Sequence, residues 1–133
     1  MALLTTVARA RRYAALAGAE AVHLTNLLTT ASEMAEDYCN RLFTSTPYAT
    51  EDQDGSGDNQ LWVRNPPITA LTSIYVIDAS GDDETILAAD FDWDADTGHV
   101  RFDPEADSDF TWFPVGIGNV QITYTGGYAA IPD

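Results

Sequence analysis

Apolar residues recur every three or four positions in the first third of the chain, which predicts helices. The clearest stripe predicts one long helix that packs on the core, with members Leu24, Leu27, Leu28, Ala31, Met34, Ala35, Tyr38 and Leu42. A shorter helix is predicted to start after Thr5 or Thr6, whose hydroxyls can cap it, and to end near Ala17, before Gly18.

After residue 50, alternating β-branched and aromatic residues are interrupted by Gly, Pro, Asn and Asp, which is typical of strands and turns. Helices followed by strands, without alternation, predict an α+β fold with two N-terminal helices, one of them long, packed on an antiparallel β-sheet built from hairpins. The expected hairpins join 43–50 to 60–65, 71–78 to 85–88 and 91–94 to 99–103, and a last strand covers 119–125.

The length of 133 residues predicts a single domain. Within residues 1–133 we expect a helical part at 1–43 and a β part at 44–133.

Charge divides the chain at nearly the same place. Residues 1–50 carry four acids and four arginines, whereas residues 51–133 hold seventeen acids and two arginines, so the β part carries the whole net charge of −15. Such acidity argues against affinity for nucleic acid or anionic lipid. The excess of Asp and the absence of Lys are explained by a high-salt habitat or by a GC-rich genome.

No apolar run reaches the roughly 20 residues that span a bilayer, and the first residues lack the layout of a signal peptide, so no membrane partner is expected. Catalysis also finds no support, because His23 and His99 lie in different halves of the chain. Cys39 lies inside the predicted long helix, next to its apolar stripe, where a buried and inert thiol is expected. We therefore expect no enzyme.

The weak metal candidates are Asp92, Asp94 and Asp96, which alternate like the first oxygen ligands of a calcium loop. The sixth position of that loop is Thr97 rather than Gly, and its twelfth is Asp103 rather than Glu. The sequence therefore predicts no metal and no cofactor, with a half-buried strand and solvent-facing acids in this segment.

Four motifs occur in an order that resembles tailed-phage head–tail connector (adaptor) proteins. They are the helix end at 35–43 (AEDYCNRLF), the strand start at 65–74 (NPPITALTSI), the hairpin at 91–102, and the last strand with its glycines at 119–128 (NVQITYTGGY), which Ile131 and Pro132 follow. The resemblance covers about residues 20–132.

The resemblance implies a non-enzymatic structural protein that forms a ring below the portal of a tailed virus, extends the DNA channel and docks the stopper or tail. Its partners would be the portal, a stopper or tail protein, and other copies of itself in a ring of roughly twelve that matches the portal. DNA would pass through without specific binding. The protein would lie in the virion neck, after assembly in the host cytoplasm.

Two alternatives stay open. One is another neck component, such as a tail-completion or stopper protein. The other is a stand-alone calcium-dependent β module that binds a ligand through residues 90–103.

The expected interface residues lie near the two ends of the sequence. Arg9, Arg11 and Arg12 form the basic cluster of the first helix and are expected to contact an acidic face of the portal or of a neighbouring subunit. A solvated helix face is the alternative for these arginines. Tyr128 and Ile131 are the other expected contacts.

Overall fold

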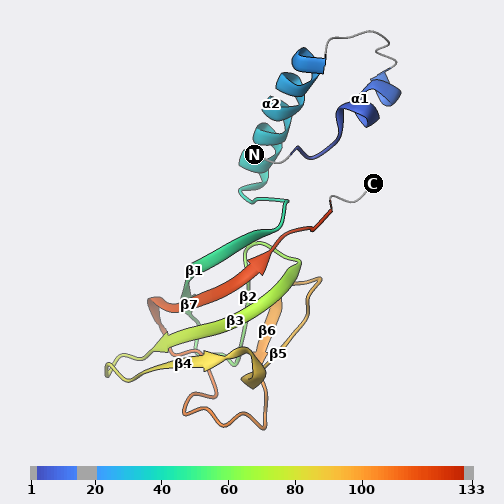
Figure 1. The fold of residues 1–133 in the computed structure, drawn as a ribbon. Coiled ribbons are helices and arrows are strands. Elements are labelled where there is room, and N and C mark those ends of the chain that lie inside the picture. Colours follow the sequence, from blue (N-terminus) through green and yellow to red (C-terminus); the bar gives the residue numbers. More distant parts are fainter. Residues whose placement is uncertain (1–2, 15–20, 131–133) are drawn as a thin grey trace.

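The computed structural model describes residues 3–14 and 21–130 (Figure 1). Two helices are followed by strands, which confirms the α+β class, although strand outweighs helix. The elements are α1 (Val7–Ala14), α2 (Ala21–Cys39), β1 (Thr46–Gly55), β2 (Gln60–Trp62), β3 (Ile68–Ile77), β4 (Asp83–Leu87), η1 (Ala88–Asp90), β5 (Phe91–Trp93), β6 (His99–Phe102) and β7 (Gly116–Gly126). Neither described helix is both long and apolar enough to cross a membrane.

The described strands form two antiparallel sheets rather than the single expected sheet, with strand orders β1-β7-β3-β4 and β2-β6-β5. The predicted hairpins β3–β4 and β5–β6 are confirmed. The hairpin expected between the segments 43–50 and 60–65 is wrong, because β1 pairs with β7 and β2 pairs with β6. In the turn after β1, Gly57 and Asp58 exchange backbone hydrogen bonds with Phe113, and β2 enters the other sheet.

The core lies between the two sheets. Residues on β3 and β7 alternate in and out, so that Ile74 lies beside Ile122 and Val76 beside Val120, all four fully buried. Aromatic side chains of the smaller sheet and of the long loop before β7 close the other side, where the Phe102 and Phe113 rings lie 4.7 Å apart. Each sheet therefore covers the inner face of the other.

The helices project from one end of the sheets instead of covering a sheet face (Figure 1). On α2 the buried side chains are Leu24, Ser32 and Glu36, whereas Leu27 and Met34 are each 67% exposed. The expectation that the apolar stripe packs on the core is therefore wrong. The physical reason is that the two sheets bury each other's inner apolar faces, so the core is closed without any residue of α2.

The first helix packs on the second near the junction with the sheets. The Leu4 N–H donates to Ser32 Oγ at 3.1 Å, and the Arg9 N–H donates to Thr6 Oγ1 at 3.2 Å. Thr6 therefore caps α1, as one of the two threonines was predicted to do. The expected helix end at Ala17 and Gly18 lies outside the described residues.

The end of β7 is tied to the segment that leaves α2. The Tyr128 N–H donates to the Phe43 carbonyl at 2.8 Å, and the Ser45 N–H donates to the Tyr128 carbonyl at 3.0 Å. Gly127 has φ +103°, and a Cβ there would lie 2.4 Å from the Thr44 carbonyl oxygen. The second glycine of the terminal motif therefore permits this close crossing.

Candidate interaction surfaces

The arginines of α1 were predicted as an interface. Arg12 is exposed, and Arg9 is half-buried and lines a small recess with Leu3, Leu4 and Ala130. The structure thus brings the start of α1 close to the segment that follows β7. The side chain of Arg11 lies outside the described residues.

Tyr128 and Ile131 were the two residues predicted as contacts near the C-terminal end, and the structure describes Tyr128 alone. The Tyr128 side chain is partly exposed while its backbone is held against Phe43 and Ser45. Ile131 lies outside the described residues. Their roles as interface residues stay predictions.

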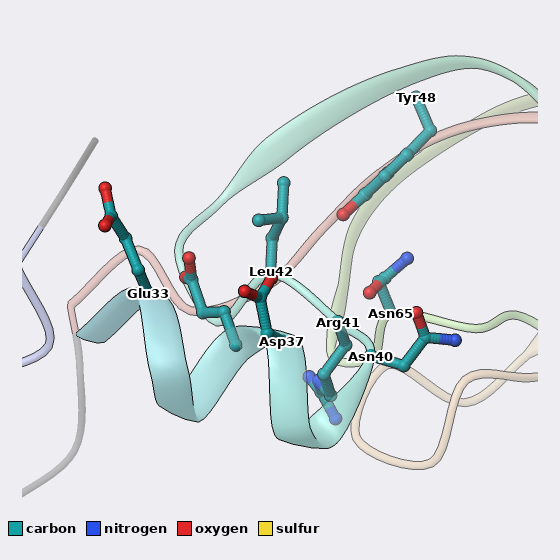
Figure 2. A pocket seen from close by; sticks show the side chains of 8 residues that line it. Glu33, Asp37, Asn40, Arg41, Leu42, Tyr48 and Asn65 are labelled. Carbon is teal, nitrogen blue, oxygen red and sulfur yellow. The ribbon is translucent and has the colours of Figure 1, made fainter. Parts of the chain in front are cut away.

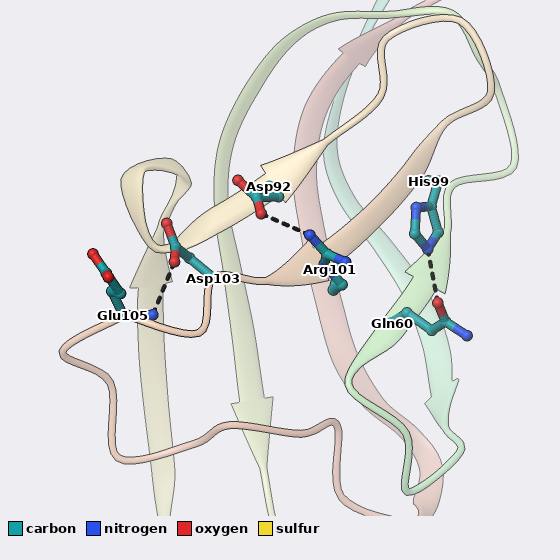
Figure 3. Close-up of polar contacts among 6 residues, drawn as sticks. All are labelled: Gln60, Asp92, His99, Arg101, Asp103 and Glu105. Carbon is teal, nitrogen blue, oxygen red and sulfur yellow. Dashed lines mark hydrogen bonds and ion pairs between the residues drawn. The ribbon is translucent and has the colours of Figure 1, made fainter.

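The acidic hairpin β5–β6 uses its carboxylates for local contacts (Figure 3). Asp92 Oδ2 accepts a hydrogen bond from Arg101 at 3.0 Å. Asp94 Oδ1 accepts from the backbone N–H groups of Asp96 and Thr97, and the bond from Thr97 in particular holds the pKa of Asp94 below its usual value. Within the described residues no three acid, His or Cys side chains are grouped as a metal site.

We expect calcium to leave the stability of the protein unchanged. Asp92 and Asp94 already have hydrogen-bond partners, and Thr97 stands where a calcium loop needs glycine. A thermal melt with chelator and one with millimolar calcium should share one midpoint. An upward shift of several degrees with calcium would contradict this expectation.

The exposed apolar side of α2 is the most prominent uncovered surface of the helical part. Leu27, Ala31, Met34 and Tyr38 recur at spacings of four, three and four and therefore share one face of the helix. All four are exposed, and Tyr38 is 92% exposed. We call these four residues the α2 stripe. A contiguous apolar surface of this kind marks a contact with another molecule more often than a solvated face.

A second candidate surface is a pocket of about 570 Å³ where the end of α2 meets the sheets (Figure 2). We call it the junction pocket. Most of its lining residues carry polar or charged groups, and they are Glu33, Glu36, Asp37, Asn40, Arg41, Leu42, Tyr48 and Asn65.

Two charged residues of the junction pocket have structural contacts of their own. Buried Glu36 accepts a hydrogen bond from the Phe43 N–H through Oε1 at 3.2 Å. The Arg41 guanidinium donates to the Pro66 carbonyl and lies 5.2 Å from the centre of the Phe43 ring. These contacts fix the path of the chain from α2 into β1.

Three buried polar atoms around the junction pocket have no hydrogen-bond partner in the described part of the chain. They are Arg41 Nε, the Tyr48 hydroxyl oxygen and Asn65 Oδ1. Buried polar atoms are nearly always paired, so such atoms need an explanation. All three belong to residues that line the junction pocket.

Sequence reasoning missed the junction pocket. Glu36 was not among the residues predicted to be buried, yet it is. The available signal was its place one turn after Ser32, since both residues lie on the side of α2 that faces the rest of the chain. Tyr48 and Asn65 gave no local signal, because the fold alone brings them to the end of α2.

Cys39 is exposed, so the expected buried thiol is wrong. The helix ends at this residue and Asn40 takes a positive φ of 50°, so no further turn covers the sulfur.

A family model described as head completion protein (HCP) matches residues 3–133, which include both helices and both sheets. No curated protein matches the chain.

Proposed function

The chain belongs to the head completion protein family, and we propose that it is a non-enzymatic adaptor that forms a ring between the portal and the tail of a tailed virus. Family membership places it among structural proteins of the phage head and neck. The finer assignment, an adaptor below the portal rather than a stopper or tail-completion protein, is the proposal.

The observation that carries this proposal is the uncovered α2 stripe. Apolar residues that the sheets leave exposed need a partner, and repeated copies of one chain can supply it. The stripe lies on the neutral part of the sequence, whereas residues 51–133 carry the full net charge of −15. Copies that meet through their helices therefore avoid bringing the acidic β parts into close contact.

The acidic β part supports a channel that does not hold DNA. A wall rich in carboxylates repels phosphate and gains nothing from the release of counterions, so it binds a passing duplex weakly. A ring with its helices packed side by side and its sheets facing the channel or solvent fits this distribution of charge.

We expect the variant that replaces Arg9, Arg11 and Arg12 with alanine to co-sediment less with portal particles than the wild type. Removing three positive charges weakens the attraction to an acidic face of the portal or of the neighbouring copy. Electrostatic complementarity between two surfaces mainly raises the rate at which they associate. Alanine favours helix, so α1 should still form, and melting curves check that the monomer stays folded.

The matched control is Arg64→Ala, which removes one exposed charge from the β part. Equal co-sedimentation of the triple variant and the wild type would remove these arginines from the interface. Retardation of DNA in a gel by the wild type, without binding to portal particles, would overturn the adaptor assignment.

A further inference from the structure

We propose that the junction pocket of one copy receives the Arg12 guanidinium of a neighbouring copy, an inference that rests on the ring proposed above. The contact joins two different surfaces of the same chain. It gives the ring a direction and assigns a role to a pocket that the fold alone leaves incomplete.

The charge of the junction pocket favours a cation. Glu33, Glu36 and Asp37 supply three carboxylates against one guanidinium, that of Arg41. Arg41 is already held by the Pro66 carbonyl and by the ring of Phe43. An incoming positive group therefore meets an excess of negative charge at the junction pocket.

The unpaired atoms narrow the choice to a cation with several donors. Asn65 is only 9% exposed, and its Oδ1 is an acceptor without a partner. The Tyr48 hydroxyl oxygen is a second acceptor without one. A guanidinium carries five N–H donors in a plane, so it suits a site whose lining offers several acceptors. Arg41 Nε is itself a donor, so an incoming guanidinium cannot be its hydrogen-bond partner.

The position of α1 makes Arg12 the suitable arginine and a neighbouring copy its source. The start of α1 lies beside Ser32, and the helix runs away from the junction pocket toward the N-terminal end of α2 (Figure 1). With 19 residues, α2 is roughly 28 Å long. Arg12 is exposed and lies in the second half of α1, after the part of the chain that contacts Ser32.

A contact between the two ends of the helical part is head-to-tail. Contacts of this kind between identical subunits close into rings when the rotation between copies permits it. The proposed contact is therefore consistent with the adaptor ring, and it predicts which surfaces meet.

The test uses the absence of lysine from the sequence. The Arg12→Lys variant keeps the positive charge and introduces the only side-chain amine of the chain. Isotope-labelled and unlabelled copies are mixed at high protein concentration and low ionic strength, so that salt does not screen the contact, and treated with a carbodiimide, which couples amines to adjacent carboxylates. Mass spectrometry then identifies peptides that join a labelled copy to an unlabelled one.

We expect mixed-isotope products that join position 12 to Asp37 or Glu33. Adding Glu36→Gln, which leaves Asp37 and Glu33 available for coupling, should lower their yield about tenfold, since the site loses one of its three carboxylates. The control is Arg101→Lys, whose amine lies next to Asp92 of the same copy and should give products within one copy. Melting curves check that the exposed substitution at position 12 leaves the fold intact.

Products that join position 12 mainly to acids of the β part, or no mixed-isotope product, would overturn the inference. The adaptor role is tested separately by portal binding. The mixed product without portal binding would support this contact and remove the adaptor assignment. A portal-bound ring without the mixed product would support the adaptor assignment and overturn this contact.

Discussion

Replacing Glu51 with alanine is expected to lower the free energy of unfolding by about 2–4 kcal/mol, because buried donors lose their acceptor. Glu51 is 6% exposed, and its Oε1 accepts from the Arg64 N–H at 3.0 Å and from Gln53 Nε2 at 2.7 Å. Its Oε2 accepts from the hydroxyl of buried Tyr124. One carboxylate thus joins β1, β7 and the segment after β2.

Denaturant unfolding of the Glu51→Ala variant measures this loss, with Asp52→Ala as the matched control. Asp52 is the next residue of β1 and its side chain is exposed, so its replacement should change the free energy of unfolding by less than about 0.5 kcal/mol. Equal midpoints for the two variants would show that Glu51 does not join the strands in solution.

The hydrogen bond between Tyr124 and Glu51 is also expected to affect the stability of the protein at high pH. Burial, and then the hydrogen bond and charge of Glu51, raise the pKa of Tyr124 above its ordinary value. The folded protein therefore holds a proton that the unfolded chain releases near pH 10, so stability from this group is present below that pH and falls above it. The fall should be shallower in the Glu51→Ala variant.

Introducing charge into the α2 stripe is expected to abolish assembly while the monomer stays folded. The triple variant Leu27→Glu, Met34→Glu and Tyr38→Glu should reduce the binding of copies to portal particles at least about a hundredfold, since carboxylates at a packed apolar contact stay unpaired. All three side chains are exposed in the monomer, and glutamate is a good helix former, so the melting temperature should change little.

Leu87→Glu is the matched control for this triple variant. Leu87 is 62% exposed on β4, far along the sheets from the helices, and it tests whether any added surface charge prevents assembly (Figure 1). Sedimentation with portal particles measures both variants. Assembly of the triple variant at wild-type levels would show that the α2 stripe faces solvent in the ring.

The sequence predicted the features of the fold that depend on neighbouring residues. The three-and-four spacing from Leu24 onward located α2, and the turns at 80–83 and 95–98 located the hairpins β3–β4 and β5–β6. Local periodicity carries this information because it reports which side of an element is apolar.

Features that depend on long-range packing could not be predicted in this way. An apolar stripe shows that a face needs a partner, but not whether the partner is the same chain, which is why α2 was wrongly placed on the core. Strand pairing between β1 and β7 joins residues that are distant in sequence, and no turn between them determines it.

Buried carboxylates were missed for a related reason. Glu36 and Glu51 are charged residues in otherwise ordinary patterns, and such residues nearly always face solvent. Their burial depends on donors from distant segments, such as the Tyr124 hydroxyl for Glu51. The polar junction pocket therefore becomes visible only in the folded chain.

Electron cryomicroscopy of portal particles mixed with the wild-type chain tests the adaptor ring most directly. The predicted result is a closed ring of copies on the tail-facing side of the portal, coaxial with its channel, with helical parts in contact and the α2 stripe covered. Portal particles without a ring, or a chain bound in the channel as a plug with its α2 stripe facing solvent, would contradict the account.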